Sequence, residues 1–152
     1  MPATAQAAPV ALASTTPGLA LLGTISVAQH SPLFEQHFPE FAVLPGSLGL
    51  ALGLQLLFEH LARVSHGVHG APEGGALPPS AITLRRVAFL APVRPGDHLT
   101  VLLHAQRSSA SESLMRLEWL RGSDCVLNAV IAWRHDATTP APKPTSNEAH
   151  AA

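Results

Sequence analysis

The sequence has little of what several classes of protein require. Its 152 residues include one cysteine, Cys125, which excludes an intramolecular disulfide framework and a cysteine-based zinc site and agrees with a cytoplasmic location. Charged residues make up 12%, and nine Lys and Arg against ten Asp and Glu leave a formal net charge of −1, which argues against binding to nucleic acid. The longest apolar stretch, from Leu48 to Leu57, is interrupted by Gln55 and is too short to span a bilayer of about 30 Å. We therefore expect neither nucleic acid nor a membrane as a partner.

The two ends of the chain differ in composition from its middle. Residues 1–17 are rich in Ala, Thr and Pro and lack the basic segment of a secretory signal, so we expect a disordered leader. Residues 136–152 carry three prolines among Thr, Ser and Ala and predict a disordered tail. Hydrophobic residues, 47% of the chain, are sufficient for one core over residues 18–135, and the scarcity of charge predicts a subunit interface.

The folded part reads as one strand, one long helix and four further strands. Loose alternation predicts a strand over Leu21 to Gln29, and leucines at helical spacing without proline predict a mostly buried helix from Gly46 to Val64. Four strand-like runs follow, at Ser80 to Leu90, His98 to Arg107, Ser113 to Arg121 and Asp124 to Arg134. Short turns between these runs predict that consecutive strands are antiparallel neighbours. The order predicts an α+β fold in which an antiparallel sheet wraps around one central helix.

The segment from His37 to Gly46 reads HFPEFAVLPG and places a histidine nine residues before the glycine that opens the helix. Pro45 restricts the residue before it to extended conformations, and Gly46 permits close approach, so the helix N-terminus can present N–H groups to a ligand oxygen. The helix dipole would stabilise the enolate that forms when a proton leaves the carbon beside a thioester. A nearby imidazole could take that proton.

These residues resemble the β-hydroxyacyl-acyl carrier protein dehydratases of the hotdog fold. The resemblance covers Leu21 to Arg134 and includes a second segment, Arg86 to Asp97, which ends in a Pro-Val-x-Pro-Gly-Asp turn. It implies substrates held as 3-hydroxyacyl thioesters on an acyl carrier protein, in fatty acid, polyene or polyketide biosynthesis, with neither cofactor nor metal.

The resemblance also implies roles for individual residues. His37 matches the catalytic histidine, and Val43 matches the residue whose carbonyl orients the histidine ring. Gly46, with Ser47, matches the backbone donors to the thioester oxygen.

The second catalytic residue of that family is missing. It is a Glu or Asp fourteen positions after the histidine, and Ala51 occupies that position here. Gln55 matches a glutamine found one turn further on, which supports the alignment; it is either a substrate contact or a polar residue on the less buried side of the helix. Because a positioned acid or base contributes about 10²–10⁴-fold, His37 alone should be a weak dehydratase.

Other carboxylates are poor replacements for the missing acid. Glu59 lies two turns beyond Ala51, roughly 12 Å along the helix axis at about 1.5 Å per residue. Glu35 and Glu40 flank the histidine segment, where loop carboxylates are usually solvated.

Two groups of basic residues have both a functional and an ordinary interpretation. Arg85, Arg86 and Arg94 could dock an acidic carrier protein or its phosphopantetheine phosphate, or could be ordinary surface charge. The helix end and the glycine-rich stretch after it contain three histidines, His60, His66 and His69. No Asp, Glu or Cys cluster supports them, so we predict no metal site there.

Three functions follow from this reading. The first is an enzyme that dehydrates or isomerises acyl thioesters. Either an unidentified acid or water assists its leaving group, or a paralogous subunit completes its site. The second is a non-catalytic subunit of a dehydratase heterodimer, because dimers of the family build each site from the histidine of one chain and the acid of the other. The third, a thioesterase, also needs a carboxylate to activate water and ranks last. We expect a homodimer or a heterodimer with an acid-bearing paralogue.

Overall fold

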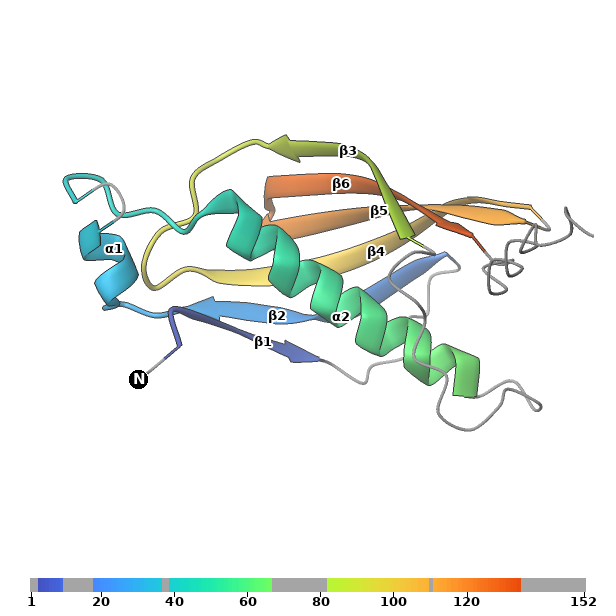
Figure 1. Cartoon of the computed structure of the whole chain (residues 1–152), viewed down its shortest axis with the longest axis horizontal. Coiled ribbons are helices and arrows are strands. Elements are labelled where there is room, and N and C mark those ends of the chain that lie inside the picture. The colour runs from blue at the N-terminus through green and yellow to red at the C-terminus, as the bar shows by residue number, and fades with distance from the viewer. Residues whose placement is uncertain (1–2, 10–17, 37–38, 67–81, 110, 135–152) are drawn as a thin grey trace, which may run out of the picture.

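The computed structural model of the protein describes residues 3–9, 18–36, 39–66, 82–109 and 111–134. The described residues form two helices and six strands, whose arrangement can be followed in Figure 1. In chain order they are β1 (Ala5–Pro9), β2 (Leu19–Val27), α1 (Pro32–Gln36), α2 (Gly46–His66), β3 (Ile82–Phe89), β4 (His98–Ser108), β5 (Glu112–Arg121) and β6 (Asp124–Arg134).

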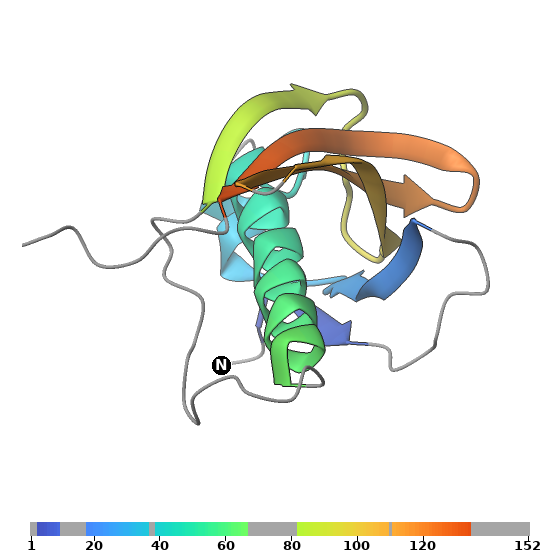
Figure 2. The ribbon, with the colours of Figure 1, turned by 90° about the vertical axis from the view of Figure 1, so that its right-hand side faces the viewer.

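The six strands form one antiparallel sheet in the order β1-β2-β4-β5-β6-β3. The sheet curls around α2, which lies along its concave face, as Figure 2 shows. This arrangement confirms the predicted α+β class and the hotdog fold. The predicted helix start at Gly46 is also confirmed, and the predicted bounds of β6 agree with the structure.

One predicted strand pairing is wrong. β3 does not pair with β4, the next strand in the chain, but with β6, where Val87 lies opposite Ala129. Pro92 and Pro95 interrupt the segment between β3 and β4, so it cannot make the short hairpin that consecutive neighbours need. It crosses the end of the sheet instead.

The expected leader also differs from the structure, because its residues 5–9 form β1. This strand pairs with β2, and Ala5 and Ala7 pack against the core. Gly23 of β2 has no room for a side chain, because a Cβ there would clash with the carbonyl of Ala8. Small residues at this place on both strands therefore allow a close contact, although the composition of β1 resembles that of a disordered chain. The other expected leader residues, apart from 3 and 4, and the tail 136–152 lie outside the described residues.

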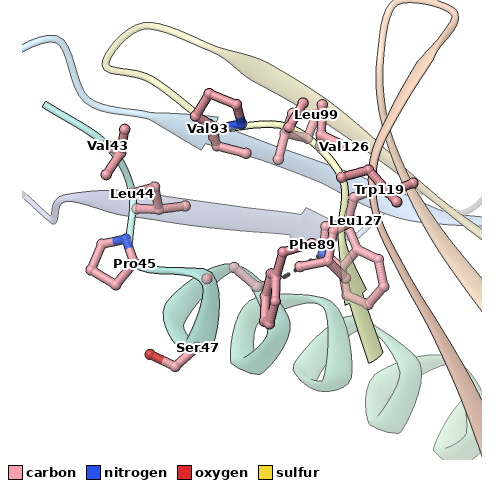
Figure 3. A pocket seen from close by; sticks show the side chains of 15 residues that line it. Val43, Leu44, Pro45, Ser47, Phe89, Val93, Leu99, Trp119, Val126 and Leu127 are labelled. Carbon is pink, nitrogen blue, oxygen red and sulfur yellow. Dashed lines mark hydrogen bonds between the residues drawn. The ribbon is translucent and has the colours of Figure 1, made fainter. Parts of the chain in front are cut away.

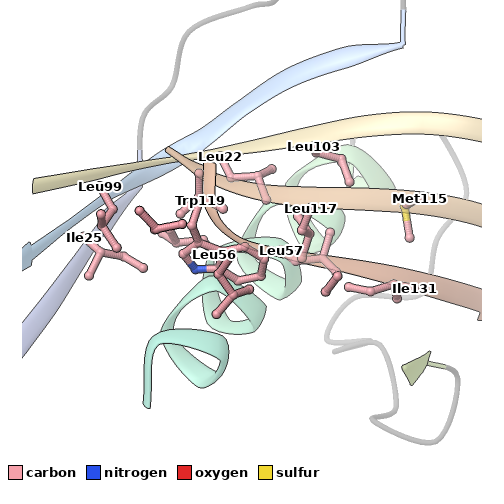
Figure 4. Packing of buried hydrophobic residues seen from close by; sticks show 14 of the residues in the cluster. Leu22, Ile25, Leu56, Leu57, Leu99, Leu103, Met115, Leu117, Trp119 and Ile131 are labelled. Carbon is pink, nitrogen blue, oxygen red and sulfur yellow. The ribbon is translucent and has the colours of Figure 1, made fainter. Parts of the chain in front are cut away.

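The core lies between α2 and the concave face of the sheet. Leu56 and Leu57 are fully buried on α2, and they pack in one cluster with Leu117, Trp119 and Ile131 of β5 and β6 (Figure 4). A smaller buried cluster lies near the start of α2. It consists of Val27 at the end of β2, Phe34 of α1 and Leu44 of the segment before α2. In the described part of the chain, no helix is both long and apolar enough to cross a membrane.

Two glycines bring α2 close to β5. The indole Nε1 of Trp119 donates a hydrogen bond of 3.0 Å to the carbonyl of Gly49, which lies on the first turn of the helix. One turn later, a Cβ at Gly53 would clash with the Trp119 ring. A side chain at position 53 would therefore push the helix and the indole apart.

We expect Gly53→Ala to destabilise the protein by about 1–3 kcal/mol, the usual cost of an extra methyl group in a full core. Gly49→Ala is the matched control on the same helix, because a Cβ there would meet only Leu44 Cδ2, at 3.7 Å. Its higher helix propensity should add up to about 1 kcal/mol of stability. Urea unfolding of both variants measures the difference, and equal effects would show that Gly53 is not a packing constraint.

Candidate functional site

A cavity of about 530 Å³ opens beside the N-terminus of α2 (Figure 3). Its volume lies in the range of sites that hold a small-molecule ligand. Three parts of the chain line it: the segment before α2 with its first turn, the end of β3 with the connection that follows, and the inner face of β4 to β6. The lining residues are Val43–Ser47, Gly49, Phe89–Val93, Leu99, Trp119, Val126 and Leu127.

The first turn of α2 presents backbone donors to this cavity. The carbonyl of Pro45 accepts hydrogen bonds from the N–H groups of Leu48, at 3.0 Å, and Gly49, at 3.2 Å. The N–H groups of Gly46 and Ser47 have no acceptor among the described residues, and both residues line the cavity. The positive end of the helix dipole lies at the same place, so the turn favours a ligand oxygen that carries negative charge.

The mouth of the cavity is apolar and exposed, whereas its inner end is buried. Phe89 and Leu90 are 58% and 56% exposed, and the ring of Phe89 lies so close to Gly46 that a Cβ there would clash with it. Leu99 and Val126 at the other end are each 1% exposed. An elongated apolar group could therefore enter past Phe89 and reach the core.

Asp97 holds the wall formed by the connection between β3 and β4. Its Oδ2 accepts the N–H of Arg94 at 2.8 Å and Nη1 of Arg121 at 2.9 Å, and Arg121 also donates to the carbonyl of Pro92 at 3.0 Å. The N–H of Leu44 donates to the carbonyl of Val93 at 2.7 Å, which ties the connection to the segment before α2. These bonds keep two walls of the cavity at a fixed separation.

The family model of the ApeI-like dehydratases, described as ApeI dehydratase, matches residues 18–119. The chain belongs to the ApeI-like dehydratase family. The match includes the whole segment before α2 and the connection between β3 and β4. A search of curated proteins found no match.

This ApeI-like protein is similar to several solved structures. Thioesterase superfamily member 2 from Mus musculus has 10% sequence identity and a TM-score of 0.51, over 86% of this chain and 81% of that chain. The dehydratase heterocomplex ApeI:P from Xenorhabdus doucetiae has 16% identity and a TM-score of 0.47, over 80% and 93%. At such low identity the likeness to the mouse protein shows the fold alone.

His37 lies outside the described residues of this ApeI-like chain, so its catalytic role stays a prediction. Two residues that the sequence analysis associated with it are described. Val43 lines the cavity, and Gly46 begins α2 beside it. The structure therefore brings together the predicted backbone donors and the residue predicted to orient the histidine ring.

The predicted substrate contact Gln55 does not line the cavity. Gln55 and Ala51 are exposed on α2, and Nε2 of Gln55 donates to Oε1 of Glu59 at 3.2 Å. This stripe of α2 faces away from the sheet, and the position where related dehydratases carry an acid bears only the methyl group of Ala51. A substrate role for Gln55 stays a prediction.

The three arginines considered for carrier-protein docking have separate environments. Arg85 pairs with Glu112 of β5 at 3.2 Å, and the guanidinium of Arg94 lies 5.2 Å from the centre of the Phe41 ring. Arg86 is exposed on β3. Of the three, only Arg94 lies in the connection that borders the cavity, and a docking role for any of them stays a prediction.

Other titratable groups lie away from the cavity. Burial lowers the pKa of His60, and the charge of Arg63 lowers it further. Burial raises the pKa of the Cys125 thiol, and the charge of Glu118 raises it further. Across the described ranges, no group of three His, Cys, Asp or Glu residues could hold a metal ion.

The sequence analysis missed Phe89 and Trp119 as cavity residues. Trp119 continues the alternation of Met115 and Leu117, which marks inward positions of β5. That signal shows burial, but it cannot distinguish a residue packed in the core from one that also faces a cavity.

We expect Asp97→Ala to lower the free energy of unfolding by about 1–3 kcal/mol, because the Arg94 N–H and Arg121 lose their shared acceptor. The N–H groups of Leu44 and Gly96 form backbone hydrogen bonds that hold this connection in place, and they should exchange their hydrogen with solvent faster. Glu112→Ala is the control: it removes an exposed pair, with Arg85 54% exposed, and should cost at most about 1 kcal/mol. A similar loss in both variants would contradict a special role for Asp97.

Proposed function

We propose that this ApeI-like protein removes water from 3-hydroxyacyl chains held as thioesters on an acyl carrier protein. The observation that carries the proposal is the pair of N–H groups, on Gly46 and Ser47, that have no acceptor in the described chain and lie at an apolar cavity. A thioester carbonyl can accept hydrogen bonds from them while its acyl chain occupies the cavity. Hydrogen-bond donors fixed in advance at a developing oxyanion are a main source of rate enhancement.

In this proposal His37 takes the proton from the carbon next to the thioester. The electron pair of that C–H bond moves into an enolate, whose oxygen the Gly46 and Ser47 amides and the helix dipole stabilise. The bond from C3 to its hydroxyl then breaks, a second carbon–carbon bond forms between C2 and C3, and the hydroxyl leaves as water after it receives a proton. The products are an enoyl thioester and water.

In this proposal the proton donor for the leaving hydroxyl comes from another chain. Among the described residues no Asp or Glu lines the cavity, and Ala51 takes the place of the family's acid. A homodimer would have the same deficiency in both sites. We therefore propose a heterodimer with a paralogue that carries Glu or Asp at the position equivalent to Ala51.

The unpaired edge of β3 is the surface that would meet this paralogue. β3 ends the sheet, and it and the residue after it expose Leu84, Phe89 and Leu90, which are 41%, 58% and 56% exposed. An edge of this kind is a template for pairing with another strand. Because Phe89 and Leu90 also line the cavity, a subunit on this edge would reach its mouth.

The second candidate is a subunit without its own catalytic role. The exposed Ala51 favours it, because the site that contains the partner's histidine and this chain's α2 would lack an acid. A thioesterase would also need a carboxylate to activate water, and none lines the cavity in the described chain.

The deciding experiment is intact-protein mass spectrometry of a 3-hydroxyacyl carrier protein incubated with this chain, with and without an acid-bearing paralogue. We expect the mixture to remove one water from the substrate and the chain alone to remove little. His37→Ala should abolish the additional water loss that is seen only with the paralogue. Water loss that is unchanged in the His37→Ala mixture would leave the non-catalytic role as the correct one. Release of the free acid in place of water loss would indicate a thioesterase.

We expect Ala51→Glu to raise dehydration by the chain alone by about 10²–10⁴-fold, the usual contribution of a positioned acid or base, because in a pair of copies the new carboxylate of one serves the cavity of the other. Ala51→Gln is the matched control, because it has nearly the same size and cannot donate a carboxyl proton. Single-turnover dehydration assays compare the two variants. An equal gain in both, or a gain that persists when His37 is replaced by Ala, would contradict the assignment of position 51.

A further inference from the structure

Trp119 closes the inner end of the cavity. Its side chain is fully buried on β5 and lines the cavity together with Leu99 and Val126, as Figure 3 shows. Beyond it lies the packed core, in which Leu117 and Ile131 are also fully buried. A chain that enters past Phe89 therefore meets the indole before it meets the rest of the core.

The indole cannot easily move out of the way. Its Nε1 donates to the carbonyl of Gly49 at 3.0 Å, and its ring lies against Gly53, where even a Cβ would clash with it. A rotated Trp119 would lose that buried hydrogen bond and would have to displace neighbouring core residues. The inner end of the cavity is thus a rigid wall.

We propose that Trp119 sets the maximum length of the acyl chain that this protein accepts. The inference rests on the proposed function, because it takes Gly46 and Ser47 as the place of the thioester carbonyl. With that end fixed, an added methylene group extends toward Trp119. Each methylene that fits gains contact with apolar wall, and the first that does not fit has to disturb a close-packed core.

The distance from the first turn of α2 to Trp119 therefore determines which acyl chain lengths bind. One methylene too many or too few in an apolar pocket changes binding by about 10–200-fold. We expect affinity to rise with chain length up to a limit and then to fall sharply. The substrates of the site are acyl chains that do not exceed this length.

The test is isothermal titration calorimetry of the full chain with saturated S-acyl pantetheines, lengthened two carbons at a time. Trp119→Phe should move the limit to longer chains, so that the first chain rejected by the wild type binds at least about tenfold more tightly. Val126→Leu adds a methylene group inside the cavity and should move the limit to shorter chains. Trp133→Phe, which changes a tryptophan that does not line the cavity, should leave the limit unchanged.

An unchanged limit in a folded Trp119→Phe protein would overturn the proposal, as would an equal shift in Trp133→Phe. If Trp119→Phe does not fold, Val126→Leu decides the question, because an unchanged limit there would equally overturn it. Failure of every S-acyl pantetheine to bind would show that the cavity is not an acyl site. These ligands have no 3-hydroxyl group, so their binding tests the length limit alone. A shifted limit together with no water loss from the 3-hydroxyacyl carrier protein in the mass-spectrometry experiment would uphold the role of Trp119 and reject the proposed reaction.

Discussion

The contact between Trp119 and the first two turns of α2 determines how the rest of this molecule is arranged. A hydrogen bond to the Gly49 carbonyl and the bare Cα of Gly53 bring the helix against β5 at one place. The helix start is thereby fixed relative to the sheet, and the space left between them becomes the cavity. The same contact positions both ends of that cavity, since the N–H of Gly46 lies on the same first two turns of α2 that contact the indole.

Sequence reasoning succeeded where local chemistry determines the structure. The Pro45-Gly46 pair marks the start of α2, and the alternation and turn residues around Asp124 to Arg134 mark β6. It failed where a strand pairs with residues that are distant in the sequence. The pattern of β3 shows a strand but not its neighbour. The composition of β1 does not show that it pairs with β2, where Gly23 leaves space for the Ala8 carbonyl.

The candidate site shows the same division. The motif around Gly46 predicts backbone donors, and the structure places them at a cavity. The amide of Gln55 could not be assigned from sequence, because a polar residue on α2 can face either a ligand or solvent, and here it bonds to Glu59. The absence of a carboxylate at position 51 is recognised only through the resemblance to a family, because an exposed alanine on a helix has no special significance by itself.

The two edges of the sheet are unlike, and this difference limits how subunits can assemble. β1 is five residues long, contains Pro9, which has no N–H to donate, and carries small side chains. Short edge strands with proline resist pairing, whereas the longer β3 exposes apolar side chains. Joining β3 of one copy to β1 of the next is a head-to-tail contact, which generates a ring or an open filament, whereas joining two β3 edges gives a closed pair. In the part of the chain that the structure describes, β1 is therefore the edge less suited to pairing, and β3 is the edge suited to one closed contact.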